Sequence, residues 1–334
     1  MARSVDEITG NRRMRRNRRF EWNRRLVREN RLSVDDLIWP VFLCEGTNVC
    51  EPLESLPGVS RYSADKIGEQ ARIAQDLGIP AIATFANIAM DKRDVNGSEA
   101  LNPDNLINTG TRAIKDAAPD IGVITDVALD LFTTHGHDGI LRDGIIVNDE
   151  TVDHIAKAAV LQAQAGADII SASEMMDGRM GAIRDALNLA GFQDTGTLAY
   201  SAKYASGFYG PYREAVGTDG LLKGDKRTYF MDPANADEAE MEALLDIEEG
   251  SDIIMVKPGM PYLDVIRRLK DKFAMPTFAY QVSGEYAMIK AGSSLGFMDE
   301  ERVVLESLTC FKRAGADAIY TYFAPQVARI LNSK

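Results

Sequence analysis

Short apolar runs alternate with amphipathic stretches along the whole chain. Eight of these runs have the length and composition of buried strands, and they lie at 35–43, 81–85, 122–127, 168–173, 198–203, 252–257, 277–282 and 317–322. The stretches between them predict helices at 63–78, 102–118, 149–165, 178–190, 236–249, 262–273 and 299–314. Strands that alternate with helices are typical of an α/β fold with a parallel sheet.

Three joints between a helix and the next strand repeat one pattern, with Gly166, Gly250 and Gly315 placed just past a helix end. Glycine takes the left-handed cap there at little steric cost. Eight strands, each followed by helical sequence, predict a (β/α)₈ TIM barrel. A doubly wound open sheet is the alternative, but the first strand–helix junction has no glycine fingerprint for a dinucleotide.

The composition fits a large α/β domain, because 45% of the 334 residues are hydrophobic. The three cysteines, Cys44, Cys50 and Cys310, form no CxxC pair and no zinc-type spacing with histidine, which fits a reduced cytosol. No apolar run approaches the length of a membrane span, and the N-terminus lacks the apolar core of a signal peptide. We therefore expect a soluble, cytoplasmic protein with no membrane partner.

Charge is distributed unevenly along the chain. Residues 1–31 carry a local charge of +7, which leaves −19 for the remainder of a chain whose total is −12. One explanation is nucleic-acid binding through phosphates; the other, which we favour, is an arm that wraps the acidic surface of a neighbouring subunit. The predicted domains are thus a basic arm at 1–33 and a catalytic barrel at 34–334, with no nucleic-acid partner.

The C-terminal ends of barrel strands carry the chemistry of this fold, and here they are Asp126, Ser173, Lys203, Lys257, Ser283 and Tyr322. Lys257 ends an apolar strand, and Pro258-Gly259 then forces the chain out of it. Burial of that amine lowers its pKa and leaves a neutral nucleophile for a carbonyl carbon. The alternative is a lysine that simply extends to solvent.

Lys203 ends another strand, and two amines in one pocket would depress each other's pKa; the alternative is two unrelated lysines on different rims. The glycine- and aromatic-rich segment that follows, about 204–226, is too irregular for a barrel helix. We interpret it as a lid that brings Arg213 and Lys226 inward to hold a carboxylate. The alternative is an ordinary mobile surface loop.

Several long motifs occur together in this chain: Met255 to Gly259, Lys203 to Arg213, Asp126 to Asp130 with Thr133 to Asp138, and Val282 to Tyr286. Together they resemble the porphobilinogen synthase family, also called δ-aminolevulinic acid dehydratase. The likeness runs from the arginine-rich arm to Tyr322. It implies a lyase that condenses two molecules of 5-aminolevulinate into porphobilinogen, with loss of two waters, in tetrapyrrole (heme, chlorophyll and cobalamin) biosynthesis.

The resemblance also implies roles for individual residues. Lys257 would form a Schiff base with one substrate, whose carboxylate Ser283 and Tyr322 would hold. Lys203 would bind the second substrate, with Arg213 and Lys226 on its carboxylate. Asp126 and Ser173 would sit beside that second substrate, and Asp138 would also be a substrate-binding residue.

The resemblance does not decide which metal ion, if any, the protein binds. Zinc-dependent relatives carry three cysteines near Asp126, Ala128, Asp130 and Asp138, and this chain has none there. We therefore expect no catalytic zinc and a place in the aspartate-type branch. The acids would hold Mg²⁺ or K⁺, work without an ion, or be satisfied by water and backbone amides; Asp130 is the weakest ligand candidate.

Two further points follow from the resemblance. Glu242 would be the ligand of a remote, activating (allosteric) Mg²⁺ at a subunit boundary, unless an arginine of the arm replaces that ion. The arm would embrace a neighbouring barrel in a homo-oligomer, an octamer or a hexamer. Phe230 departs from the family, in which many members carry glutamine, so the polar support around Lys226 is left open.

Two other classes of function compete with this interpretation. A class I aldolase on the same barrel needs only one lysine, so replacing Lys203 would spare its imine. A non-enzymatic nucleic-acid-binding protein would use the basic arm and would bind DNA or RNA in a salt-sensitive way.

Overall fold

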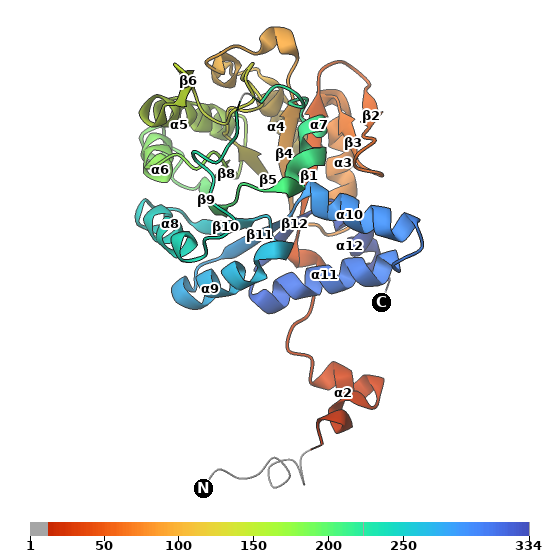
Figure 1. Ribbon diagram of the computed structural model, residues 1–334. Coiled ribbons are helices and arrows are strands. Elements are labelled where there is room, and N and C mark those ends of the chain that lie inside the picture. The colour runs from red at the N-terminus through yellow and green to blue at the C-terminus, as the bar shows by residue number, and fades with distance from the viewer. Residues whose placement is uncertain (1–12, 223, 334) are drawn as a thin grey trace, which may run out of the picture.

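The computed structural model describes residues 13–222 and 224–333. Its centre is a closed barrel of parallel strands: β1 (Leu37–Cys44), β4 (Ala81–Asn87), β5 (Gly122–Asp126), β8 (Ile169–Ala172), β9 (Gly196–Lys203), β10 (Ile253–Lys257), β11 (Thr277–Gln281) and β12 (Ala318–Thr321). Neighbours in this order are hydrogen-bonded, and β12 closes the barrel on β1 with Leu37 opposite Ile319. The predicted (β/α)₈ barrel is confirmed, and Figure 1 shows its strands enclosed by helices.

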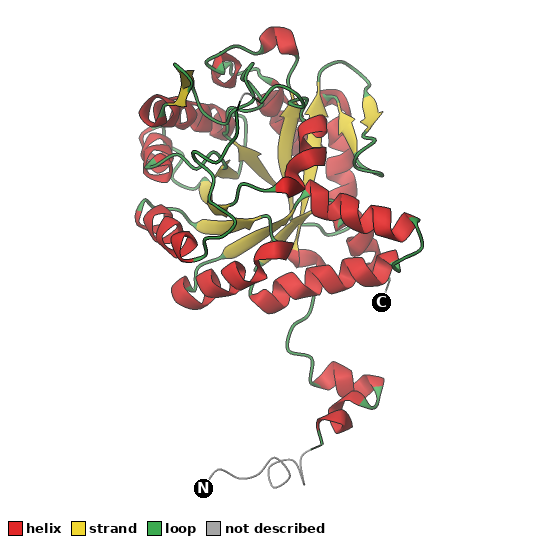
Figure 2. Cartoon of the chain, in the orientation of Figure 1, coloured by secondary structure: helices red, strands yellow, loops and turns green. Residues whose placement is uncertain are grey.

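The covering helices are α3 (Ala64–Asp76), α4 (Leu106–Ala117), α5 (Asn148–Gln164), α6 (Arg179–Leu189), α8 (Asp237–Glu248), α9 (Leu263–Phe273), α11 (Glu300–Ala314) and α12 (Ala324–Asn332). Their positions follow the sequence pattern. In α4, Ile107 and Ile114 are seven residues apart, so they share one face, and both are fully buried. Figure 2 shows this outer layer of helices around the inner strands.

The structure differs from the predicted elements in several places. The helix expected from residue 102 begins at Leu106, because the Asn105 side chain accepts the Asn108 N–H at 3.0 Å and caps the helix there. A 3₁₀ turn, Val34–Asp36, precedes β1, so the first strand starts later than predicted. An additional helix, α10 (Ser283–Ser294), follows β11 where only the later helix was expected.

The segment interpreted as a lid contains a 3₁₀ turn, Gly207–Tyr209, and a short helix, α7 (Gly210–Ala215). In Figure 1, α7 lies next to α10 at the mouth of the barrel. Two small additions complete the sheets. Strands β2 (Cys50–Pro52) and β3 (Ser60–Tyr62) extend the barrel sheet beside β1, and β6 (Leu141–Arg142) pairs with β7 (Ile145–Ile146) in a hairpin.

The three glycine joints are followed by aspartates that fasten neighbouring strands. Asp317 accepts the Thr277 N–H at 2.7 Å and also the Lys270 ammonium at 2.7 Å. Asp168 accepts the Val123 N–H at 2.8 Å in the same way, and the corresponding residue Asp252 accepts the N–H of Thr197 at 2.8 Å. These carboxylates therefore satisfy backbone donors at the end of the barrel opposite the strand C-termini.

The described part of the N-terminal arm contains a 3₁₀ turn, Met14–Arg18, and α2 (Glu21–Leu26), neither of which has a buried residue. Figure 1 shows it projecting away from the barrel. The first twelve residues of the predicted arm lie outside the described residues. Among the helices described, none is long and apolar enough to cross a membrane.

Candidate active site

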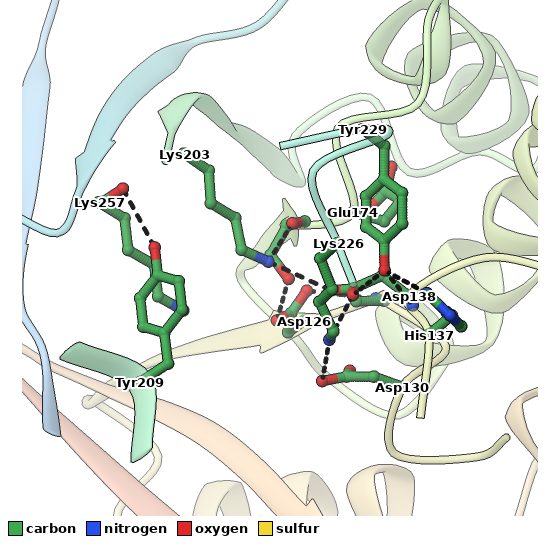
Figure 3. A network of polar contacts seen from close by, with 12 residues as sticks. Asp126, Asp130, His137, Asp138, Glu174, Lys203, Tyr209, Lys226, Tyr229 and Lys257 are labelled. Carbon is green, nitrogen blue, oxygen red and sulfur yellow. Dashed lines mark hydrogen bonds and ion pairs between the residues drawn. The ribbon is translucent and has the colours of Figure 1, made fainter. Parts of the chain in front are cut away.

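Two lysines stand side by side at the C-terminal ends of neighbouring strands. Lys203 ends β9 and Lys257 ends β10, and their Cα atoms are partners in the strand register. Paired positions place both side chains on the same face of a sheet. Both lysines are only 5% exposed, and both line one pocket at the barrel mouth. The structure therefore brings the two amines together, as Figure 3 shows.

Tyrosine rings surround the amine of Lys257. Its Nζ lies between 4.8 and 5.5 Å from the centres of four rings, those of Tyr280, Tyr200, Tyr212 and Tyr209. No ion pair joins it to a carboxylate within 13–222 or 224–333. Burial, followed by the charge of Lys203, lowers the pKa of Lys257 to about 7. A large fraction of this amine is therefore neutral near neutral pH.

Half of this aromatic enclosure comes from the barrel and half from the lid. Tyr200 and Tyr280 belong to β9 and β11, whereas Tyr209 and Tyr212 belong to the lid segment. The Tyr209 hydroxyl also donates to the carbonyl oxygen of Lys257 at 3.3 Å. Tyr209 and Tyr212 in these positions therefore help to keep water from the amine of Lys257.

Lys203 has a polar partner instead. Its Nζ donates to Asp138 Oδ1 at 3.2 Å and to the carbonyl oxygen of Ser173. The ring centre of Phe230 lies 4.1 Å from the same nitrogen. Phe230 thus supplies an apolar face to Lys203, and its ring centre also lies 5.7 Å from the amine of Lys226.

Lys226 reaches the same acid from the lid. Its Nζ lies 2.5 Å from Asp138 Oδ2 and 3.5 Å from Asp130 Oδ2. Burial lowers the pKa of Lys226, but Asp138 and Asp130 outweigh it and raise the pKa above its usual value. Burial likewise opposes ionisation of Asp138, but Lys203 and Lys226 hold its pKa well below the usual range. This network is therefore charged.

A tyrosine that the sequence analysis did not single out completes the network. The Tyr229 hydroxyl donates to Asp138 Oδ2 at 3.0 Å and lies 3.0 Å from Nδ1 of His137. Figure 3 shows both residues beside Asp138. Tyr229 lies between Lys226 and Phe230 in the sequence, but a lone tyrosine in a loop gives no signal of this contact.

Asp126 lies at the end of β5 and is 4% exposed. Its Oδ2 accepts the Ser173 hydroxyl at 2.7 Å, and its Oδ1 accepts the Ala128 N–H at 3.2 Å. Burial raises the pKa of Asp126, although Lys203 opposes this. Asp126 therefore holds a proton more readily than an ordinary aspartate does.

The other predicted residues lie around the same pocket. Arg213, on α7, lines the pocket from an exposed position. Ser283 and Tyr322 do not line it. Ser283 Oγ accepts the N–H of Tyr212, a lining residue, at 3.0 Å, and the Tyr322 hydroxyl lies 3.1 Å from that of Tyr280, whose ring faces the Lys257 amine. A single tyrosine, Tyr212 or Tyr280, therefore separates each of them from the amine of Lys257.

The donor set argues against a metal between Asp130 and Asp138. Lys226 already bridges these two acids, and both oxygens of Asp138 have lysine partners. Among the residues described, no group of three or more histidine, cysteine, aspartate or glutamate side chains is arranged to hold an ion. The ammonium of Lys226 thus supplies the positive charge that a cation would bring to these carboxylates.

Glu242 lies elsewhere, half-buried on α8, in a surface pocket that also contains Asp177, Glu238 and Arg227. Burial raises the pKa of Glu242 to about 7, although Arg179 opposes this. It belongs to no ligand cluster in the described part of the chain.

Comparison with known proteins now identifies the family. The family model described as Delta-aminolevulinic acid dehydratase matches residues 11–330. The chain belongs to the delta-aminolevulinic acid dehydratase family. The resemblance inferred from the motifs is confirmed, and with it the expectation of a lyase, a dehydratase of this family.

Individual relatives span almost the whole chain. Delta-aminolevulinic acid dehydratase of Bradyrhizobium diazoefficiens is 58% identical over 96% of this chain and 91% of its own, and that of Rhodobacter capsulatus is 49% identical over 96% and 97%. The crystal structure of the Toxoplasma gondii ME49 dehydratase, in complex with the reaction product porphobilinogen, superposes with a TM-score of 0.93. It is 45% identical and covers 95% of this chain and 91% of its own.

Proposed function

We propose that this member of the dehydratase family condenses two molecules of 5-aminolevulinate into porphobilinogen through Schiff bases on Lys203 and Lys257. The observation that carries the proposal is the strand register that pairs these two lysines in one pocket. Two adjacent amines can bind and activate two identical ketones at once, whereas an ordinary imine-forming aldolase activates one.

Lys257 is the amine prepared for the first attack. With its pKa at about 7, its neutral form attacks the ketone carbon, and loss of water leaves an imine. This imine makes the ketone carbon an electrophile. Ser283, which contacts Tyr212, and Tyr322, which contacts Tyr280, hold the carboxylate of this substrate once those two tyrosines make room.

The imine on Lys203 lets the adjacent carbon of the second substrate lose a proton and become an enamine, which attacks the electrophilic carbon on Lys257. Exchange of substrate amino groups for the lysine amines then closes the ring and frees both lysines.

Lys203 holds the second substrate. It leaves its ion pair with Asp138 when it forms the imine, and Asp138 keeps its contact with Lys226 and Tyr229. Arg213 and Lys226 face the pocket and take the carboxylate of this substrate. Asp126, whose pKa burial raises, accepts and returns the proton that the imine steps move, and Ser173 orients it at 2.7 Å.

The catalytic pocket is proposed to work without zinc, as in the aspartate-type branch, because Lys226 provides the positive charge between Asp130 and Asp138. An activating Mg²⁺ would bind at Glu242, and K⁺ is the other candidate ion. Activity measured before and after exhaustive chelation, with each ion then restored separately, tests these assignments. Recovery with zinc alone would contradict them.

Trapping with borohydride tests the central proposal. The protein is incubated with 5-aminolevulinate, reduced, digested and analysed by mass spectrometry. We expect substrate-derived mass on both Lys257 and Lys203. Labelling of Lys257 alone, unaffected by Lys203→Ala, would instead support a single-lysine aldolase.

A further inference from the structure

Glu285 is a buried acid that the proposed chemistry does not use. It is the third residue of α10, its side chain is fully buried, and it does not line the pocket. No lysine or arginine of the described chain forms an ion pair with it. Burial raises the pKa of Glu285 to about 8, although the N–H groups of Val282 and Met260 oppose this. Burying a carboxylate destabilises the fold unless hydrogen bonds offset the free energy lost on its desolvation.

Its two oxygens accept hydrogen bonds from two different segments. Oε2 accepts the N–H of Val282 at 2.6 Å, and Oε1 accepts the N–H of Met260 at 2.8 Å. The first contact is the return half of a capping box, an ordinary way to begin a helix. The second lies outside α10, because Met260 begins a separate 3₁₀ turn, Met260–Tyr262, three residues after Lys257.

The segment between Lys257 and Met260 has little freedom. The Gly259 N–H donates to the carbonyl oxygen of Tyr280 at 2.8 Å, which fastens the segment to β11. A Cβ at Gly259 would lie only 2.1 Å from a ring atom of Phe311, so the backbone is pressed against α11. The contact from Glu285 to Met260 adds a second attachment, this time to α10.

Glu285 therefore joins the two segments that serve the Lys257 side of the pocket. One follows Lys257, and the other carries Ser283, which begins α10 directly after Val282. No corresponding contact connects Glu285 to β9 or to Lys203 among the hydrogen bonds of the described residues. We therefore expect the position of Lys257 to depend on Glu285 and the position of Lys203 not to.

We infer that Glu285 is a positioning residue for Lys257, holding the exit of β10 and the start of α10 in one fixed geometry. The inference rests on the proposed two-lysine function, in which Lys257 and Ser283 must meet the same substrate. A shift of about 1 Å in such a group costs up to roughly a hundredfold in rate.

The variant Glu285→Gln distinguishes a specific effect on Lys257 from a general loss of activity at both lysines. It preserves the side-chain length but replaces one oxygen with an amide NH₂, which faces a backbone N–H instead of accepting from it. After incubation with 5-aminolevulinate and borohydride, we expect the ratio of label on Lys257 to label on Lys203 to fall about tenfold. Unfolded molecules label neither lysine, so this ratio does not depend on the fraction that folds.

Glu301→Gln is the matched control, because Glu301 is an exposed acid in the first turn of α11. Its labelling ratio is expected to equal that of the unchanged protein. An unchanged ratio in Glu285→Gln, or an equal loss at both lysines, would overturn the positioning role and leave Glu285 as a helix cap. Absence of label on either lysine of the unchanged protein would instead refute the proposed function itself.

Discussion

Lys203 and Lys257 are partners in the strand register, yet their amines have opposite surroundings. Lys203 lies 3.2 Å from a carboxylate oxygen of Asp138, whereas Lys257 faces tyrosine rings, with Tyr280 centred 4.8 Å away. The first amine has a counter-charge, and the second has a low pKa enforced by burial. In the proposed reaction, this asymmetry would give two chemically identical substrates distinguishable sites.

The low pKa of Lys257 predicts a specific pH profile. Below pH 7 the amine is protonated and cannot attack, so we expect Schiff-base formation at Lys257 to rise roughly tenfold per pH unit and to level off above about pH 7. The measurement is the initial rate of borohydride-trapped label on Lys257 at several pH values. A midpoint near 10, the value of an ordinary lysine, would contradict the structure.

The charge of Lys203 contributes to that profile. The positive charge of Lys203 lowers the pKa of Lys257, and Lys203→Met removes it. The substitution also removes the cation that partly neutralises Asp126 and Asp138, whose charges raise that pKa. Both changes favour the ammonium form, so the midpoint of labelling at Lys257 should move up by about one pH unit. A midpoint that stays in place would show that the charge of Lys203 does not set the pKa, and one that falls would contradict the expected sign of its effect.

Close contact between the lid and α10 makes Gly284 sensitive to substitution. A Cβ at Gly284 would lie 2.4 Å from the Phe208 carbonyl oxygen and 2.8 Å from its Cα, which are backbone atoms that cannot turn aside. Gly284→Ala should displace the lid, withdraw Tyr209 and Tyr212 from Lys257, and lower kcat/KM about tenfold or more. Faster limited proteolysis within 204–222 would locate the change in the lid.

The same helix offers a control for that experiment. At Gly292 a Cβ would meet only the flexible side chain of Met298, which can move. Gly292→Ala should therefore leave kcat/KM and the proteolysis pattern within about twofold of the unchanged protein. Equal damage from both substitutions would count against a specific role of the lid contact.

The aspartates at the glycine joints are expected to matter for stability. Asp317→Ala leaves the N–H of the fully buried Thr277 without its acceptor, so the free energy of unfolding should fall by about 1–3 kcal/mol. Urea unfolding at fixed pH measures this. Asp271→Ala, which breaks an exposed pair with Arg267, should change it by less than about 1 kcal/mol.

The arm is proposed to hold a neighbouring barrel in a homo-oligomer, an octamer or a hexamer. Its described part exposes apolar side chains without burying any, with Trp22 59% and Leu26 75% exposed. Removal of residues 1–33 should therefore lower the sedimentation coefficient, and Trp22→Ala should weaken assembly. An unchanged coefficient would argue against this role, and tight, salt-sensitive binding of DNA or RNA would favour the nucleic-acid alternative.

The order of strands and the lysines at their ends could be predicted because those signals are local. Apolar runs mark β9 and β10, and the residue that ends each run must lie at the strand exit. Helix α10 was missed because its first turn, with Ser283 and Gly284, has a composition typical of a turn. Its start depends on Glu285, whose second contact, Met260, is 25 residues away.

The partners of the acids were decided in the same non-local way. From the sequence, Asp130 and Asp138 were candidates for an ion, water or backbone amides, because carboxylates in a loop suit all three. Lys226 lies almost a hundred residues further along the chain, and only the folded lid brings its ammonium between them.

The sequence by itself determined the barrel, the family and the presence of a lysine at each of two strand ends, since periodicity and motifs are written in consecutive residues. Only the tertiary structure decided that the two amines face one pocket and that tyrosines from both barrel and lid enclose one of them. Burial and charge at a point in space depend on segments that are distant along the chain, so the low pKa of Lys257 arises only after folding.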